Sequence, residues 1–448
     1  MVNAEGRAVA FAIFRRLVGG TLLLLLCLAL PLPAAAQNYQ YYPIGERAAG
    51  LGGAFVAIAD DASGAYYNPA GLAEAAADSF SLSATVYGYT KVAMDNALGF
   101  GESVGDMNIT TFYAIPSLFG TVYHFGAGDA NTVAFSIVSP DVFSYRNQTK
   151  TGEDRLLFSS RSSQQTYWFG PSYARRINRH LSAGATLYGL FGQSAFEAQL
   201  SGRLNDEDFE SLRDDLRLSE NFSDDRKTFG VLAQAGVRLS WNEWHLGLVA
   251  RSPSLQAWGS GSHATSYLVT YQNEVDQDTK QIDFQPRRVD PFMVGLGVAY
   301  VSPLSWAASA DVKYHGAAKF RDADKDEVAE DVELRQVVNG NIGLEYVAAK
   351  RFPLRAGFYT NFSPYRDEGI DTYGLTLTGG YEEKQTSFSL GLNYAWGRGD
   401  TSIARIIEKN GAIATEGATV DLDVQTINVI LATSYRFGGE SRDKGKNK

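Results

Sequence analysis

Apolar and polar residues alternate with a period of two along most of the chain after residue 78. The segment 337–346 illustrates the pattern, because apolar residues alternate there with polar or small ones: Val338, Ile342, Leu344 and Tyr346 against Asn339, Asn341, Gly343 and Glu345. The same alternation recurs in 354–362 and in 427–437. Successive side chains of a β-strand point to opposite faces, so each segment predicts a strand with one apolar face. A soluble sandwich would give the same local pattern, so no single strand decides the architecture.

The number of predicted strands and the lengths of their connections distinguish a membrane barrel from a soluble sandwich better than any single strand does. Fourteen strands are predicted, at 79–92, 117–126, 131–147, 163–176, 180–199, 226–240, 243–258, 289–301, 304–318, 333–348, 352–363, 369–382, 384–398 and 422–437. Short turns follow the even-numbered strands, at 127–130, 177–179, 241–242, 302–303, 349–351 and around Glu383. The other connections are mostly long and polar, at 93–116, 148–162, 200–225, 259–288, 319–332 and 399–421; only 364–368 is short. An even strand count with this asymmetry is typical of a bacterial outer-membrane barrel, whose short turns are periplasmic.

The first residues predict a secretory signal peptide. Three arginines (Arg7, Arg15 and Arg16) precede an apolar run at 17–30, and three alanines follow at 34–36. A charged start, an apolar middle and a small-residue end indicate cleavage after residue 36. The apolar run is shorter than the roughly 20 residues of a membrane-spanning helix, which disfavours the alternative of a retained anchor.

Composition and charge narrow the class further. The single cysteine, Cys27, lies in the predicted signal peptide, so the mature chain would have no disulfide and no thiol chemistry. The 45 glycines, 24 tyrosines and 25 phenylalanines favour strands and turns over helical bundles. The net charge of −10 argues against a nucleic-acid partner. No later apolar stretch is long enough for a membrane helix, so a membrane protein would have to be a closed barrel.

Residues 37–78, between the signal peptide and the first strand, predict a small plug of short helices inside the barrel. The stretch 45–74 is rich in glycine and alanine and has the pattern of neither a strand nor a long helix. Asn68 followed by Pro69 predicts the capped start of a short helix at 70–77. Six glycines would let the backbone turn tightly in a confined lumen: Gly45, Gly50, Gly52, Gly53, Gly64 and Gly71.

The acidic pair Asp60–Asp61 in this segment has two interpretations. We expect these carboxylates either to cap a local turn or to pair with lumen arginines such as Arg355 and Arg436. Local capping is the simpler role.

Two blocks resemble the FadL-type outer-membrane transporters of long-chain fatty acids and related hydrocarbons. The first runs from Gly52-Gly53-Ala54 through Asp60-Asp61 to Asn68-Pro69-Ala70-Gly71-Leu72, and the second is the pair of strand phrases 294–300 and 354–359. The resemblance implies a barrel closed by an N-terminal hatch. It also implies hydrophobic substrates that enter through extracellular loops, diffuse past a site in the lumen and leave sideways through the wall. A sister group with a similar segment serves in protein secretion and surface attachment, so a plugged secretion-partner barrel is the alternative function.

Together these features predict where the protein lies, which partners it has and which plug residues close the lumen. We expect a monomer in the outer membrane, with its plug, its barrel 79–437 and its polar tail 438–448 arranged so that both termini are periplasmic. Its partners would be outer-membrane lipid, lipopolysaccharide, a hydrophobic ligand and the barrel-assembly machinery during biogenesis. The expected gate residues are Asn68, Pro69, Ala70, Gly52, Gly53, Asp60 and Asp61. A channel for polar solutes is a third possibility, and no residue is assigned to ligand contact.

Pro140, which follows Ser139 in the third predicted strand, is the most informative residue outside the plug. Proline lacks the N–H that a barrel strand donates, so it predicts a bulge, a kink or a break in pairing. The simpler alternative is that the strand ends at Ser139. In the FadL-type transporters a kinked third strand accompanies a side opening, and the resemblance places that opening here.

Two acidic segments and the histidines complete the candidate chemistry. Segment 206–225 could form an amphipathic helix over the barrel mouth or a solvated loop. Asp322, Asp324, Asp326 and Glu333 have calcium-loop spacing, but Glu327 stands where such a loop needs glycine, so we expect no metal site and no cofactor. The five histidines are scattered, without a metalloprotease or hydrolase motif, and we expect no enzymatic activity.

Overall fold

The computed structural model of this protein describes residues 38–40, 42–100, 103–151, 156–204, 216–272, 274–365, 369–409 and 412–437. The predicted signal peptide, the predicted tail and residues 206–215 of the acidic segment lie outside the described residues. Within the described ranges no helix combines the length and apolarity needed to cross a bilayer.

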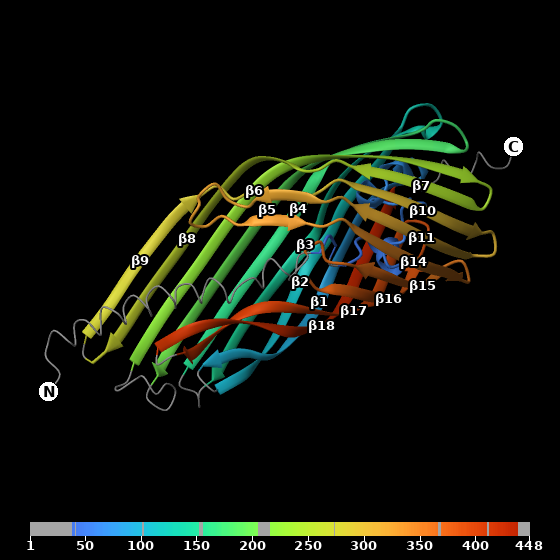
Figure 1. The fold of residues 1–448 in the computed structure, drawn as a ribbon. Coiled ribbons are helices and arrows are strands. Elements are labelled where there is room, and N and C mark those ends of the chain that lie inside the picture. Colours follow the sequence, from blue (N-terminus) through green and yellow to red (C-terminus); the bar gives the residue numbers. More distant parts are fainter. Residues whose placement is uncertain are drawn as a thin grey trace, which may run out of the picture.

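One antiparallel sheet closes on itself to form the barrel (Figure 1). Its strands are β1 (Asp78–Phe100), β2 (Ser103–Phe125), β3 (Asn131–Thr151), β4 (Leu156–Arg176), β5 (Leu181–Leu204), β6 (Leu216–Trp241), β7 (Trp244–Arg251), β8 (Leu255–Tyr271), β9 (Glu274–Phe284), β10 (Met293–Ser302), β11 (Trp306–His315), β14 (Val337–Ala348), β15 (Phe352–Asn361), β16 (Asp371–Glu382), β17 (Thr386–Lys409) and β18 (Ala412–Phe437). The pairing of β5 with β6 completes the ring. β8 pairs only with residues 216–231 of β6, and β9 pairs only with β8, so neither strand is part of the closed ring. The ring itself therefore has fourteen strands, as predicted.

The barrel carries its apolar side chains on the outside, as a lipid-facing barrel does. Leu344 and Leu377 are 60% and 64% exposed, whereas Arg355 and Asn393 are 3% and 0% exposed in the lumen. Aromatic side chains ring the end with the short turns, which we call the short-turn end: Trp241, Trp244, Trp306, Phe352, Tyr381, Tyr435 and Phe437. β10 and β11 have 10 residues each, close to the roughly 9–11 that a tilted membrane strand needs.

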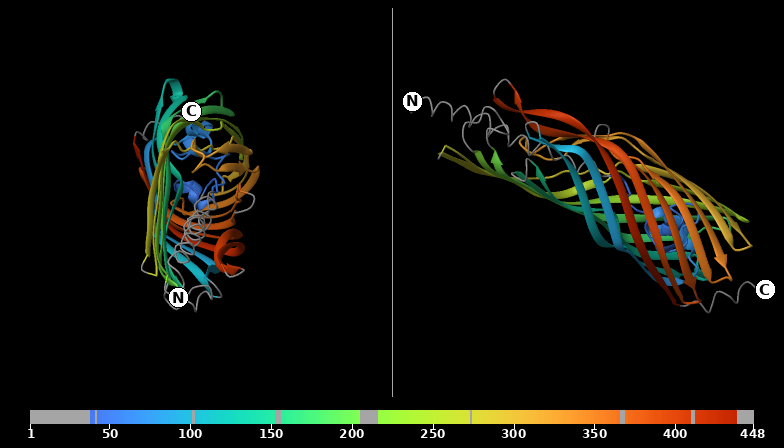
Figure 2. Two further views of the ribbon diagram at one scale, coloured as in Figure 1. Left: turned by 60° about the vertical axis from the view of Figure 1, so that its left-hand side comes forward. Right: turned by 90° about the horizontal axis from the view of Figure 1, so that it is seen from below.

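At the opposite end, which we call the extended end, the long strands separate into two facing sheets (Figure 2). Pairing of β2 with β3 stops at Leu118↔Val138, and beyond it β2 pairs only with β1, and β3 only with β4. One sheet is therefore β2-β1-β18-β17, and the other is β3-β4-β5-β6-β8-β9. One apolar cluster includes buried residues of both sheets, among them Met94 and Leu422 from the first and Phe158 and Leu218 from the second.

The main error of the sequence analysis concerns these long strands. The segments 93–116, 148–162, 200–225 and 399–421 were predicted as polar loops, but most of their described residues continue the flanking strands. Segment 259–288 likewise contains β9 and most of β8, and the hairpin β12 (Ala318–Arg321) with β13 (Asp331–Leu334) lies at 319–332. Outside a membrane a strand needs no apolar outer face, so the period-two signal is lost although backbone pairing continues.

The plug occupies the lumen near the short-turn end (Figure 1). It contains helices α4 (Glu46–Gly50) and α5 (Gly64–Tyr67) and the 3₁₀ helix η2 (Pro69–Glu74). α4 contacts β15, β16 and β18, whereas η2 contacts β3, β4, β5 and β6 on the opposite wall. The plug therefore spans the barrel from wall to wall.

Two glycines allow the plug backbone to approach the wall directly. Gly52 has φ +62°, and a Cβ there would lie 2.9 Å from the backbone nitrogen of Phe358. A Cβ on Gly357 of β15 would lie 2.2 Å from the nitrogen of Gly52. No other residue type fits at this contact.

We predict that Gly52→Ala loosens the plug, whereas Gly128→Ala has a smaller effect. Both glycines have a left-handed backbone conformation, with φ +62° at Gly52 and +65° at Gly128. However, nothing lies within 4 Å of a Cβ built at Gly128. Gly128→Ala should cost about 1 kcal/mol of unfolding free energy. Gly52→Ala adds the clash with β15, so urea unfolding in detergent should show a clearly larger loss. Equal losses would contradict the contact.

Candidate functional site

Wall side chains hold the plug by hydrogen bonds to its backbone. On β11, Asp311 Oδ2 accepts from the backbone nitrogens of Phe55 and Val56, at 2.6 and 2.8 Å. Asn341 on β14 donates to the Gly52 carbonyl at 2.7 Å, and Gln234 on β6 donates to the Tyr66 carbonyl at 2.9 Å. These polar side chains come from inward-pointing positions of the alternating strands. They satisfy backbone N–H and C=O groups of a plug segment that has little regular secondary structure.

Asn68 joins the plug to the wall and also caps η2. Its Oδ1 accepts from the Ala70 nitrogen at 3.1 Å, which is the predicted cap. Its Nδ2 donates to the carbonyls of Val56 within the plug, at 2.8 Å, and Val237 on β6, at 3.1 Å. The helix after it is a 3₁₀ helix that ends at Glu74, shorter than the predicted 70–77.

A chain of alternating charges anchors the other side of the plug. Arg47 contacts Asp60 and Glu345, each at 2.7 Å, and Arg355 contacts Glu345 at 2.6 Å and Glu382 at 3.1 Å. All five groups border one cavity of about 310 Å³ at the short-turn end. We had expected Asp60 to pair with a lumen arginine such as Arg355 or Arg436. This partner was wrong, because Asp60 pairs with Arg47 of the plug itself.

Asp61 has the predicted role of a local cap. Its Oδ1 accepts from the nitrogen and the hydroxyl of Ser63, at 2.8 and 2.6 Å. Burial raises the pKa of Asp61 to about 6; the bonds from Ser63 oppose this rise, and the neighbouring Asp60 charge adds to it.

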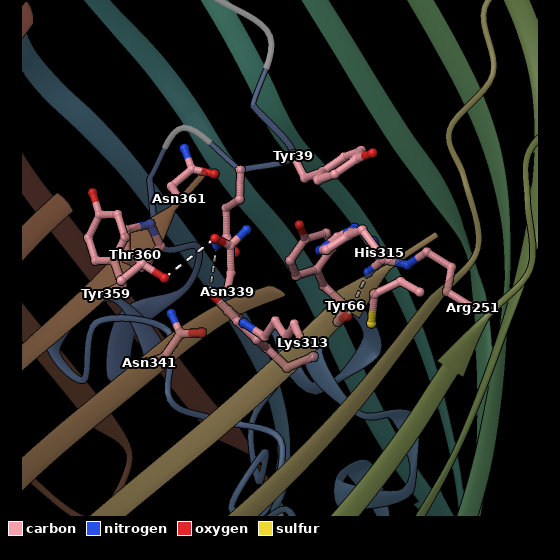
Figure 3. Close-up of a pocket in the computed structure, with 14 residues that line it drawn as sticks. Tyr39, Tyr66, Arg251, Lys313, His315, Asn339, Asn341, Tyr359, Thr360 and Asn361 are labelled. Carbon is pink, nitrogen blue, oxygen red and sulfur yellow. Dashed lines mark hydrogen bonds between the residues drawn. The ribbon is translucent and has the colours of Figure 1, made fainter. Parts of the chain in front are cut away.

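A second, polar cavity lies on the other side of the plug, toward the extended end (Figure 3). It is lined by the plug residues Tyr39, Gln40, Tyr66 and Tyr67 and by the wall residues Arg251, Lys313, His315 and Asn341, among others. Its volume is about 30 Å³, so it has room for a water molecule and not for a lipid. A larger ligand needs a rearrangement of the plug.

Both cations at this cavity contact the aromatic rings of the plug. Arg251 lies 4.9 Å from the ring centre of Tyr66, and Lys313 lies 5.1 Å from that of Tyr67. Among the described residues neither cation has a carboxylate oxygen within 4.0 Å. The positive charge at the cavity therefore contacts carbonyl groups and rings, and the Asp311 carboxylate is a further charge that interacts with Lys313.

The end of backbone pairing between β2 and β3, which we call the gap although apolar side chains pack across it, is the other unusual feature of the wall. The β3–β4 register shifts between Val138 and Asp141, so Ser139 and Pro140 form a bulge. Pro116 on β2 lies two residues from Leu118, where pairing with β3 ends. Both strands thus lack a backbone donor where they separate. Pro116 was missed because the predicted strand began at residue 117, although a second proline near a strand end was the available signal.

The acidic segments have structural roles in the described residues. Residues 216–225 form strand with Leu216 and Leu218 buried, so both the amphipathic helix and the solvated loop expected for this segment are wrong there. Asp322 pairs with Arg226 at 2.6 Å, Asp326 with Arg321 at 2.7 Å, and Glu333 with Lys319. The described residues contain no cluster of three potential metal ligands.

Solved structures share this architecture, although no family model and no curated protein matches the sequence. A FadL homologue from Pseudomonas aeruginosa matches with a TM-score of 0.61 and 12% identity, over 90% of this chain and 100% of the other. The P. putida toluene transporter TodX gives 0.60 and 15%, over 90% and 99%. The Ralstonia pickettii toluene transporter TbuX gives 0.57 and 14%, over the same shares. The chain therefore has the fold of the FadL-type barrels, as the sequence blocks indicated.

We predict that Asn68→Ala destabilises the plug more than the removal of an ordinary cap. Asn68→Ala deletes the cap and removes the donor to the buried Val56 carbonyl and the partly buried Val237 carbonyl, which should cost roughly 2–4 kcal/mol. Asn178 is a matched control, because its Oδ1 accepts from His180 and Leu181 in an exposed turn. Asn178→Ala should cost about 1 kcal/mol. Limited proteolysis of the plug and urea unfolding test this, and equal losses would show that the bond to β6 contributes nothing.

We predict that plug stability falls as the pH rises from about 4 to about 6. A carboxyl whose folded pKa is raised from 3.8 to about 6 is favoured in its protonated form, so its contribution is lost as it ionises in the fold. Asp61→Asn should flatten this dependence. Hydrogen exchange of residues 61–66 across this pH range measures it, and an unchanged slope in the variant would contradict the assignment to Asp61.

Proposed function

We propose that this protein takes up hydrophobic small molecules, long-chain fatty acids or related hydrocarbons, across the outer membrane by passive diffusion. The short-turn end and the plug would face the periplasm, in the orientation usual for such barrels. The observation that carries the proposal is the β2–β3 gap beside an apolar interior, because a closed wall would offer no path from the lumen to the lipid.

The proposed path has three stages. A hydrophobic molecule enters the apolar cluster between the two sheets at the extended end. It then moves toward the bulge at Ser139–Pro140, where β2 and β3 are no longer paired. It leaves sideways through the gap, while the plug with its gate residues keeps the axial route closed. The names of the similar structures, a FadL homologue and toluene transporters, support the same substrate class.

The polar cavity favours a fatty acid over a plain hydrocarbon. Arg251 and Lys313 could bind a carboxylate, since charge-assisted hydrogen bonds to a buried anion are strong. An aliphatic hydrocarbon would gain nothing from these cations, and an aromatic one such as toluene would gain only a weaker cation–π contact. We therefore expect labelled long-chain fatty acid to enter more efficiently than toluene, and Lys313→Met to reduce this preference severalfold in a liposome uptake assay.

We predict that restoring backbone donors at the gap reduces uptake. In the variant Pro116→Thr/Pro140→Thr both strands regain an N–H where they separate, so they can extend their pairing. Uptake of labelled fatty acid should fall severalfold. Pro303→Ser, in a turn at the short-turn end, is the control and should transport normally. Unchanged uptake in the double variant would remove the lateral exit from the proposal.

The alternative of a plugged secretion-partner barrel predicts a different result. The wild-type protein would then show no uptake of fatty acid or hydrocarbon in liposomes and would co-purify with a large secretion complex. Swelling of the same liposomes in sugar solutions would instead indicate a channel for polar solutes.

A further inference from the structure

The bulge in β3 is the meeting point of three elements that are distant in the sequence. The wall contributes Ser139 to Asp141 and, on β4, Gln164 and Thr166. The start of the plug contributes Tyr42, whose hydroxyl donates to the Ser139 carbonyl at 2.9 Å. The third element is the connection 285–292 between β9 and β10, which we call the strap.

The first half of the strap is tied to the extended end of the barrel. The Gln285 nitrogen donates to Asp324 Oδ1 at 2.6 Å, next to the β12–β13 hairpin. Gln256 on β8 donates to the Pro286 carbonyl at 2.6 Å and accepts from the Arg288 nitrogen at 2.8 Å. A displacement of β8 and β9 therefore moves the strap with it.

One side chain of the strap reaches the bulge. Arg288 contacts Asp141 Oδ2 at 2.9 Å and donates to the Thr166 hydroxyl at 3.1 Å. The same Asp141 oxygen accepts from Gln164 Nε2 at 2.9 Å. The Asp141 side chain is 6% exposed, so removing Arg288 would leave its charge uncompensated.

Arg288 also has a second carboxylate within reach. Asp290, in the strap itself, lies 3.6 Å from the same guanidinium nitrogen that contacts Asp141. A small cavity of about 50 Å³ separates these groups from Tyr39 of the plug and Pro140 of the bulge. The Arg288 guanidinium therefore lies within ion-pair distance of both carboxylates. A movement toward Asp290 would give up the contact with Asp141 and keep one ion pair, and the cavity leaves space beside Arg288 for it.

We propose that Arg288 is a two-position latch that couples the β8–β9 hairpin to the gap in the wall. When Arg288 is on Asp141, the strap holds the bulge in place against Tyr42 of the plug. When Arg288 is on Asp290, the bulge is released and the gap can widen. The latch rests on the proposed function for its purpose, because it regulates the same lateral exit, but its existence is a property of the fold and can be tested without transport.

The test is hydrogen exchange of full-length protein in nanodiscs, read at residues 113–117 and 141–145. In Arg288→Gln and in Asp141→Asn these amides should exchange faster, on the order of tenfold or more, because a buried ion pair is broken. Asp290→Asn removes the second position, so it should keep the amides at least as protected as in the wild type. Arg287→Gln, at the exposed neighbouring arginine of the strap, is the matched control and should exchange like the wild type.

The double variant Asp141→Asn/Arg288→Gln guards against misfolding, because it leaves no buried unpaired charge. It should exchange as fast as the single variants while it keeps the heat-modifiable gel mobility of a folded barrel. Exchange in Arg288→Gln and in the double variant that matches Arg287→Gln would overturn the latch. In uptake assays the latch predicts more uptake for Arg288→Gln and less for Asp290→Asn. Absence of uptake in the wild type would overturn only the proposed function, since the exchange result decides the latch separately.

Discussion

The structure depends on hydrogen bonds from inward-pointing wall side chains to the backbone of the plug. Most of the plug is neither helix nor strand, so its buried N–H and C=O groups need partners from elsewhere. Asp311, Asn341 and Gln234 supply them from three different strands. Because an unpaired buried polar group costs free energy, the plug can occupy the lumen only where these side chains converge. The polar inner face of the barrel is therefore a template for one particular irregular chain.

The same requirement distinguishes the β2–β3 seam, where backbone pairing ends at Leu118 and Val138, from the rest of the wall. The short strands β10 and β11 are paired over their whole length, and their inner faces are engaged by the plug. At the seam, Pro116 and Pro140 remove donors from both strands, and the inward groups Asp141 and Thr166 bond to the strap instead of the plug. The seam thus contacts an element that comes from the extended end, whereas β10 and β11 contact the plug.

Much of the barrel architecture could be predicted from the two-residue alternation of apolar and polar side chains and from the lengths of the turns. Leu344 and Glu345 belong to opposite faces in the sequence pattern, and in the structure they are 60% and 9% exposed. The continuation of β1 and β2 into residues 93–116 could not be predicted in the same way. There the strands are held by backbone pairing, and their outer faces can be polar, so apolar and polar residues need not alternate. The cap at Asn68 was visible because the N–H that donates to its side chain, that of Ala70, is two residues away. Its bond to Val237, 169 residues distant, has no local signal.

The sequence by itself determined the all-β class, the fourteen-stranded ring and the presence of a capped, glycine-rich plug, because these follow from side-chain alternation, turn length and local backbone preference. Only the tertiary structure decided which groups meet inside the barrel. It joined Arg47 to Asp60 and Glu345, and it brought Arg288 to the bulge beside Pro140. These contacts depend on the register of strands far apart in the chain, and register is set by closure of the whole ring rather than by any short stretch of residues.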